Sequence, residues 1–282
     1  MRIREAADED LGRLHEIFVA AWEHLHERYA PRRLGPGDLG ERVPFLRHLR
    51  RTGLVVVADD PEPVGFAAAI VREGVWFLSQ LWVLPEHHGS GAGAALLDEA
   101  LVFGRGASVF STMSSPHPAA QLLYLRASMF PMWVSMEMAG GDGAAGERPD
   151  GVRDLVEDDQ GWVDDLDREV RGAARREDHA FWRTEEGTAL ALERPDGPAG
   201  YAYVWPDGKV GPGAVRDPGD VSIAIEASRL AGGSTFSVPS VSWRALGELV
   251  RLGFRPTGAT TTFMASRPLG DGARYFPTGA LG

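Results

Sequence analysis

The residues best suited to chemistry in this sequence are three glycines within five positions, Gly89-Ser90-Gly91-Ala92-Gly93, followed by a helical pattern. The first N–H groups of a helix lack intrahelical partners and carry partial positive charge. Because glycines have no side chains, a phosphate can approach such donors closely. The stretch therefore predicts a site for a pyrophosphate-bearing ligand. The alternative is a tight turn that binds nothing.

A dinucleotide is one ligand of this kind, since Gly89, Gly91 and Ala94 satisfy the spacing G-x-G-x-x-G/A. That motif requires an acidic residue at the end of the next strand, roughly 20 residues on, to hold a ribose hydroxyl. The next predicted strand ends in FSTMSSPH, which has no carboxylate. The sequence therefore disfavours a dinucleotide. A P-loop is excluded as well, because Lys209 is the only lysine and no Gly-Lys-Ser/Thr run exists.

Composition limits the classes of function. The chain has 282 residues, with 40 Asp and Glu against 29 Lys and Arg and a net charge of −11. This balance argues against a nucleic-acid binder with a basic surface. No apolar run of about 20 residues predicts a membrane span, the charged start lacks a signal-peptide core, and there is no cysteine. We expect a cytoplasmic protein of about two domains.

The two halves of the chain show the same order of patterns. RIREAADEDLGRLHEIF is followed in the second half by VRDLVEDDQGWVDDLDREV, EPVGFAAAIV by GPAGYAYVW, and AAQLLYLRASMFP by SWRALGELVRLGFRP. Such repetition indicates two copies of one unit of interleaved strands and helices, which is an α/β fold with mixed strand directions. Between them, Ala139–Gly151 is rich in glycine and charge, as a linker is.

The predicted elements of the first half place the glycines between a strand and a helix. Helices are expected over Leu11–His26, Leu39–Arg51, Gly93–Phe103 and Ala119–Ala127. Strands are expected over 2–5, 54–60, 63–71, 74–84, 107–113 and 133–139, because these segments are apolar or alternate. The strand over 74–84 therefore leads directly into the glycine loop.

From FLSQLWVLPEHHGSGAGAALL through HPAAQLLYLRASMFP, the first half resembles the Gcn5-related N-acetyltransferase (GNAT) family. The family's phosphate loop, Arg/Gln-x-x-Gly-x-Gly/Ala, matches residues 88–93. Its later helix, Asn-x-x-Ala-x-x-Leu-Tyr, matches His117, Ala120, Leu123 and Tyr124 in register. His88 and His117 depart from the family pattern. The resemblance implies two tandem GNAT-like domains, over 1–140 and 151–282, each with a mixed, largely antiparallel central sheet flanked by helices.

The resemblance also implies acetyl-CoA as the acyl donor. Its pyrophosphate would lie on residues 88–93, and its pantetheine would contact His117 and pair with the strand edge formed by Leu81, Trp82 and Val83. The Val83 N–H would stabilise the oxyanion. Tyr124 would be the acid that protonates the CoA thiolate. The acceptor would be a primary amine, which must lose a proton before it attacks because its pKa is about 10.

The base for that deprotonation stays open, because the strand FLSQLWV offers no carboxylate. A group at the end of the first helix is the candidate for the amine pocket, and its members are Glu23, His24, His26 and Glu27. Within this group Glu23 is the candidate catalytic residue, and Trp22 and Trp82 would form walls of the pocket. The adjacent His87 and His88 have no evident third ligand, so no metal site is predicted.

In the second half, Asp217 and Asp220 stand where the anion would bind, and carboxylates repel a pyrophosphate. Leu249 or Val250 takes the place of the tyrosine. We therefore expect catalysis in the N-terminal domain, on a primary amine of a small molecule or peptide, by a monomer or homodimer. The alternatives are a sensor that binds acyl-CoA without turnover and a structural protein with a decayed acetyltransferase fold.

Overall fold

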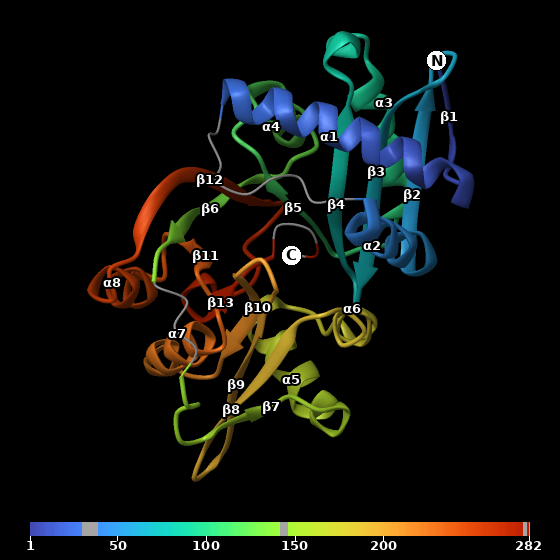
Figure 1. The fold of residues 1–282 in the computed structure, drawn as a ribbon. Coiled ribbons are helices and arrows are strands. Elements are labelled where there is room, and N and C mark those ends of the chain that lie inside the picture. Colours follow the sequence, from blue (N-terminus) through green and yellow to red (C-terminus); the bar gives the residue numbers. More distant parts are fainter. Residues whose placement is uncertain (30–38, 142–145, 279–280, 282) are drawn as a thin grey trace. The chain divides into compact units, whose positions relative to one another are not determined.

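The computed structural model describes residues 1–29, 39–141, 146–278 and 281, without the side chains of 39–41. The chain forms two compact units, drawn in Figure 1. The first comprises Met1–Pro131 and Thr262–Arg267, and the second Met132–Thr261 and Pro268–Gly282. No helix within the described ranges is both long and apolar enough to cross a membrane.

The first unit is a sheet with helices on both faces. Its strands are β1 (Arg2–Glu5), β2 (Gly53–Asp59), β3 (Pro63–Arg72), β4 (Val75–Val83), β5 (Val109–Ser114) and the end of β12 (Arg255–Ala265), in this order across the sheet. Neighbours are antiparallel except β4 and β5, which are parallel. Its helices are α1 (Leu11–Arg28), α2 (Leu39–Thr52), α3 (Ala92–Phe103) and α4 (Pro118–Arg126).

The register between β3 and β4 slips by one residue at Ser79. Such a bulge moves every later side chain to the other face of the sheet. Before the slip, Trp76 reaches the face that α3 covers, where its Nε1 donates to the Ala100 carbonyl at 2.9 Å. After it, Trp82 packs edge-on against Phe18 of α1, with 5.0 Å between ring centroids. The two tryptophans would share a face in a regular strand, and the bulge separates them.

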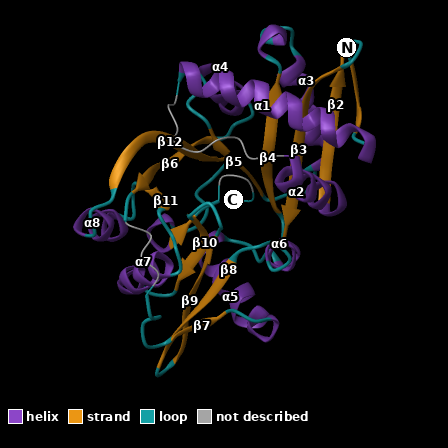
Figure 2. Cartoon of the chain, viewed as in Figure 1, coloured by secondary structure: helices purple, strands orange, loops and turns teal. Residues whose placement is uncertain are grey.

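The second unit repeats this plan (Figure 2). Its strands, in order across the sheet, are the first part of β12, β6 (Phe130–Ala139), β11 (Thr235–Pro239), β10 (Lys209–Val215), β9 (Gly197–Val204), β8 (Thr188–Arg194) and β7 (Val152–Asp154), while β13 (Tyr275–Phe276) pairs with β10. Its helices are α5 (Gln160–Arg171), α6 (Arg176–Trp182), α7 (Val221–Leu230) and α8 (Trp243–Arg251). The prediction of an α/β fold with mixed, largely antiparallel sheets is confirmed.

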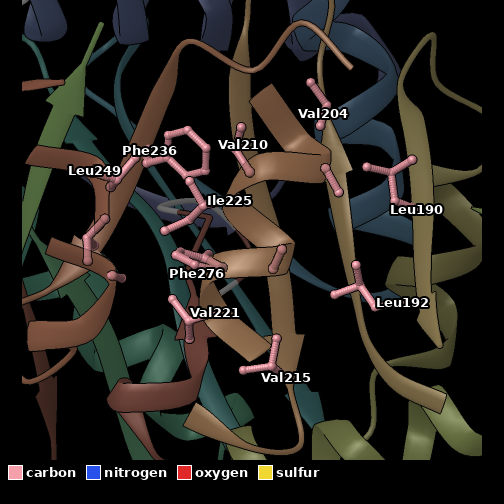
Figure 3. Packing of buried hydrophobic residues seen from close by; sticks show 14 of the residues in the cluster. Leu190, Leu192, Val204, Val210, Val215, Val221, Ile225, Phe236, Leu249 and Phe276 are labelled. Atoms are coloured by element: carbon pink, nitrogen blue, oxygen red, sulfur yellow. The ribbon is translucent and has the colours of Figure 1, made fainter. Parts of the chain in front are cut away.

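A core of apolar side chains from β8 to β11, α7 and α8 holds the second unit together (Figure 3). Leu190 from β8, Phe236 from β11, Ile225 from α7 and Leu249 from α8 all meet in it and are inaccessible to solvent. Burial of each such side chain contributes roughly 1.5–3 kcal/mol. The second unit is therefore held together by one continuous apolar core.

The internal repeat extends to an ion-pair arrangement. In each unit, an arginine on the edge strand binds both the acid that begins the first helix and an acid on the neighbouring strand. The two sets are Arg4 with Asp10 and Asp59, and Arg153 with Asp159 and Glu193. All four ion pairs have N–O distances between 2.6 and 2.8 Å. The two halves thus share side-chain geometry as well as sequence pattern.

Each half contributes a strand to a unit built mainly from the other half. From Met132 onward β6 belongs to the second unit, where it pairs antiparallel with β11. β12 begins in the second unit, and its residues Thr262–Ala265 pair with Ser111–Ser114 of β5 in the first. The domains predicted over 1–140 and 151–282 follow chain order, whereas the compact units exchange these strands. The linker predicted over Ala139–Gly151 lies partly outside the described residues.

Candidate active site

The glycine loop lies between β4 and α3, as its sequence predicts. Gly89 and Gly91 have φ angles of +83° and +92°, which favour glycine over residues with a Cβ. Gly91 is the N-cap of α3. A Cβ built on either glycine would meet no atom within 4 Å, so the space beside the loop is open. A ligand can therefore lie against the backbone of Gly89 and Gly91 without displacing a neighbouring side chain.

Three backbone donors of this loop are unused within the described part of the chain, namely the N–H groups of Gly89, Gly91 and Gly93. By contrast, the Ser90 N–H donates to the His87 carbonyl at 3.3 Å. Unused N–H groups at the positive end of a helix form an anion-binding site. The loop thus has the geometry needed to hold a phosphate.

The last residues of β4 form an open sheet edge beside this loop. β4 pairs with β5 only over Val75–Leu78, opposite Val109–Thr112. From Ser79 to Val83, β3 is the one neighbouring strand within the described ranges. The sheet therefore splays at this point, leaving backbone groups of β4 available to an extended ligand.

The direction of these backbone groups follows from one hydrogen bond. The Leu84 N–H donates to the Val64 carbonyl of β3 at 2.9 Å. Along an antiparallel strand, successive residues direct their backbone groups to opposite sides. The backbone of Trp82 therefore faces β3, whereas the N–H and C=O groups of Leu81 and Val83 face the open edge. This is the direction that the predicted pantetheine contact requires of Leu81 and Val83.

Three histidines from separate elements meet at this edge. The Nε2 of His88 lies 3.1 Å from the Val83 carbonyl. The His88 ring contacts His24 of α1, with centroids 5.6 Å apart, and His117 before α4, at 5.4 Å. The His117 ring also contacts Tyr29, at 5.1 Å. An extended ligand that pairs with Val83 must therefore displace His88 from the carbonyl.

Within this cluster, the surroundings of His117 favour the neutral form of its imidazole. Partial burial lowers the pKa of His117, and the proximity of His88 and His24 lowers it further. His117 therefore stays neutral at pH 7 and can donate or accept one hydrogen bond. Its position directly before α4 is that of the asparagine in the predicted family motif.

Tyr124 lies on α4 and is only 6% exposed. Burial raises the pKa of its phenol, so the group is protonated at neutral pH. The preceding residue, Leu123, places α4 beside the glycine loop, because its Cδ1 lies 3.5 Å from a Cβ built on Gly93. Tyr124 thus has the protonation state of an acid, on a helix adjacent to the anion site.

The residues predicted to form the amine pocket at the end of α1 have different surroundings in the structure. His24 contacts His88 and belongs to the histidine cluster. His26 instead stacks on Trp22 at 4.0 Å, with its Nδ1 2.7 Å from the Trp22 carbonyl. Glu23 is exposed. The role of Glu23 as the base stays a prediction, and His24 is the member of the group that reaches the open edge.

Sequence reasoning missed a polar cluster on the α1 and α2 side of β4. The Nη2 of Arg42 donates to the Gln80 Oε1 at 2.5 Å, and the Trp82 Nε1 donates to the same oxygen at 2.7 Å. The Arg42 Cζ lies 3.6 Å from the centroid of the Phe18 ring. Arg42 stands three residues before Phe45, and this spacing places two side chains on the same face of a helix. An arginine beside an apolar residue of the helix was therefore the signal in the sequence that could have indicated the cluster.

In the second unit, carboxylate side chains lie at the loop that corresponds to the glycine loop. The Asp217 Oδ1 accepts the Gly219 N–H at 2.6 Å, just before α7. Asp220 is buried and forms an ion pair with Arg194; burial raises its pKa, although Arg194 opposes the shift. At the tyrosine position, Leu249 is a core residue. The negative groups occupy the place where a phosphate would bind.

A second polar cluster that the sequence did not reveal lies inside the second unit. Asp167 accepts from the Arg175 Nε at 2.8 Å and from the Tyr201 hydroxyl at 2.5 Å, and its Oδ2 lies 3.0 Å from the His179 Nε2. Burial alone would raise the pKa of Asp167, but Arg175 and His179 hold it below its usual range. Every charge in this set has a partner, as expected of a structural network.

Comparisons of the sequence relate this chain to known acetyltransferases. A family model described as the Acetyltransferase (GNAT) family matches residues 11–129. A curated relative from Archaeoglobus fulgidus, an uncharacterized N-acetyltransferase, is 33% identical over 110 residues, which are 36% of this chain and 73% of the relative. The region that the family model matches contains the glycine loop, the histidine cluster and Tyr124.

Solved structures share the fold over nearly the whole chain. A putative acetyltransferase from Pyrococcus horikoshii has a TM-score of 0.81 at 18% identity, covering 100% of this chain and 95% of that one. A tandem GNAT protein from the clavulanic acid biosynthesis pathway has a TM-score of 0.60 at 15% identity, covering 95% of this chain and 99% of its own. The predicted tandem GNAT-like fold is confirmed.

Proposed function

The chain belongs to the acetyltransferase (GNAT) family, and from this premise we propose that it transfers an acetyl group from acetyl-CoA to a primary amine of a small molecule or peptide. Acyl transfer is the general activity of the family. One observation carries the finer proposal: three N–H groups at and just before the start of α3, which no described residue uses, lie beside the open backbone edge of β4.

The acyl donor is held by backbone groups. The N–H groups of Gly89, Gly91 and Gly93 bind its pyrophosphate. The backbone groups of Leu81 and Val83 pair with its pantetheine in the manner of an added strand. His88 leaves the Val83 carbonyl as the donor enters, and residues 88–93 then enclose the phosphates. This assignment uses donors that have no other partner within the described residues.

The reaction needs one oxyanion donor, one acid and one base. The neutral amine attacks the thioester carbonyl carbon, and the Val83 N–H stabilises the negative charge that develops on the oxygen. As the carbon–sulfur bond breaks, Tyr124 gives its proton to the thiolate. The base removes the proton that the amine loses. Acetyl amide and free thiol are the products.

The base lies at the end of α1. Glu23 is the assignment from sequence, and the structure favours the neighbouring His24, because the His24 ring contacts His88 at the open edge. A neutral imidazole has a ring nitrogen that can accept a proton from the amine. We propose His24 as the base and Glu23 as the alternative.

The second unit does not bind acetyl-CoA in this proposal. Asp217 and Asp220 lie at the start of α7, where the first unit presents bare N–H groups. Carboxylates in that position repel a pyrophosphate. Catalysis is therefore assigned to the first unit alone.

Two measurements on the purified full chain test the proposal. Isothermal titration with acetyl-CoA, with NAD as the control ligand, should give binding to acetyl-CoA only. Release of free thiol from acetyl-CoA should then depend on an added amine. Binding without amine-dependent thiol release would support a non-catalytic acyl-CoA sensor. Absence of acetyl-CoA binding would overturn the proposal and favour a structural protein.

A further inference from the structure

Arg42 of α2 is a half-buried arginine in largely apolar surroundings. Its Cζ lies 3.6 Å from the Phe18 ring centroid and 5.2 Å from that of Phe45. Its Nη2 donates to Gln80, a neutral amide. Its Nε is inaccessible to solvent and has no hydrogen-bond partner in the described structure. The guanidinium therefore has donor capacity that the described side chains do not use.

The charge of Arg42 is also uncompensated by the described residues. Burial lowers its pKa to about 10, no acidic side chain among the described residues opposes the shift, and the group is still charged at neutral pH. The fully buried Arg175 shows the contrast, because Asp167 lies 2.8 Å from it. A charge removed from water without a partner is costly. An anion supplied by a ligand would remove that cost.

The position of Arg42 indicates which ligand would supply that anion. Gln80, its hydrogen-bond partner, also accepts from Trp82, and Trp82 directly precedes Val83 at the open edge. The Gln80 and Trp82 side chains lie on the α1 side of the sheet, whereas α3 and its anion site begin from the other side. Arg42 therefore lies beside the proposed reaction centre but apart from the loop that holds the donor's phosphates.

We propose that Arg42 binds a carboxylate of the acceptor, so that the acceptor is an amine bearing one carboxylate, such as an amino acid. This inference rests on the proposed acetyltransferase function. A guanidinium presents two parallel N–H donors that match a carboxylate. One arginine neutralises one negative charge, which favours a carboxylate over a phosphate dianion. The net charge of −11 does not oppose this, because it describes the whole chain rather than the pocket.

The experiment compares matched acceptors on the full chain. Thiol release is measured with a panel of amino acids, the corresponding amino acid amides and the corresponding decarboxylated amines. We expect kcat/KM for at least one amino acid to exceed that for its amide by about 30-fold or more. In Arg42→Met this preference should fall to about threefold or less, and Arg42→Lys should retain part of it.

Arg47→Gln is the matched control, because Arg47 lies on the same helix and pairs with Asp8 at 3.8 Å, away from this cluster. It should keep the full preference. Titration of an N-acetyl amino acid against its amide provides a readout that needs no turnover, and it should show the same preference. Circular dichroism establishes that each variant is folded. If Arg42→Met does not fold, the acceptor preferences of the native enzyme and of Arg42→Lys test the inference instead.

The possible failures are distinguishable. If the native enzyme acetylates amino acids and their amides equally well, or acetylates only amines without a carboxylate, the inference is wrong and the acetyltransferase function stands. If Arg42→Met keeps the preference, another group recognises the carboxylate and the assignment to Arg42 is wrong. If no amine in the panel releases thiol and neither N-acetyl ligand binds, both the inference and the proposed function fail.

Discussion

At the scale of single residues, the protonation of Tyr124 determines whether it can act as the acid. Burial raises the pKa of this tyrosine above its ordinary value of about 10. The phenol is therefore protonated throughout the neutral range and holds a proton to give. Phenylalanine has the same ring without that proton, so Tyr124→Phe should lower kcat by about 100-fold. The Kd for acetyl-CoA should change by less than about threefold.

Kinetics and titration on the same preparation check this prediction. Tyr29→Phe is the control, because Tyr29 is exposed and phenylalanine keeps the ring that contacts His117. It should keep near-normal turnover. Normal turnover in Tyr124→Phe would remove Tyr124 from the mechanism, and a large loss of acetyl-CoA affinity would show that its role is in binding.

Two adjacent residues of α1 test the identity of the base. His24→Gln removes the imidazole that contacts His88, and Glu23→Gln removes an exposed carboxylate from the next position. We expect His24→Gln to lower kcat/KM by about 100-fold at pH 7, as loss of a general base does. Glu23→Gln should stay within about twofold of the native rate.

Thiol release by the native chain and by both variants at pH 7 is the measurement, with the Kd for acetyl-CoA as the control for binding. The opposite result, with loss in Glu23→Gln and normal rates in His24→Gln, would restore the assignment made from sequence.

At the scale of elements, the start of α3 is the feature that defines the donor site. Gly91→Glu and Gly91→Gln place side chains of nearly equal size at the same φ of +92°. Both should lose about 1–2 kcal/mol of stability because a Cβ is strained there. Only the carboxylate repels a phosphate, by roughly 4 kcal/mol at about 4 Å. Gly91→Glu should therefore raise the Kd for acetyl-CoA about 1,000-fold relative to Gly91→Gln.

Titration of both variants, with thermal unfolding to measure the shared strain, makes the comparison. Equal affinities in the two variants would show that no phosphate lies at this loop. The pair separates charge from backbone strain, which Gly91→Glu alone does not.

The elements themselves were largely predictable from sequence. Apolar periodicity placed α1, and the glycines placed the break between β4 (Val75–Val83) and α3 (Ala92–Phe103) within one residue of the predicted segments. These signals are local, because a helix start or a left-handed glycine depends on its immediate neighbours. The repeat between the halves was visible for the same reason, since each copy retains the order of its patterns.

The arrangement of side chains was less predictable, and one bulge is the main cause. Regular alternation would put Trp76 and Trp82 on one face, but the slip at Ser79 turns Trp82 and Gln80 toward α1 and α2. No local pattern in the strand marks that slip. The partnership of Arg42 with Gln80 followed from it, and so was absent from the prediction. Similarly, His24, His88 and His117 come together only because distant elements pack.

At the scale of the whole molecule, β12 makes the first unit depend on the end of the chain. Residues Thr262–Ala265 pair with Ser111–Ser114 of β5. A chain ending at Gly141 lacks that strand, and β5 then exposes unpaired backbone groups along its edge. We expect such a fragment to aggregate or to unfold at least 10 °C below the full chain, although it contains the complete glycine loop.

Size-exclusion chromatography and thermal unfolding of the fragment test this dependence. Addition of a second fragment, residues 146–282, should restore a folded species if the missing strand is the cause. A monomeric fragment of residues 1–141 with the thermal stability of the full chain would show that the first unit does not need β12.

The strand exchange bears on which changes each half of the chain can accept. Asp217 accepts a hydrogen bond within its own loop, and Leu249 packs in the core of the second unit, so changes at these two positions act within that unit. A change in Thr262–Ala265 of β12 acts on the first unit instead, because these residues pair with β5. Whatever chemistry the second half has, the first unit needs it for the completion of a sheet.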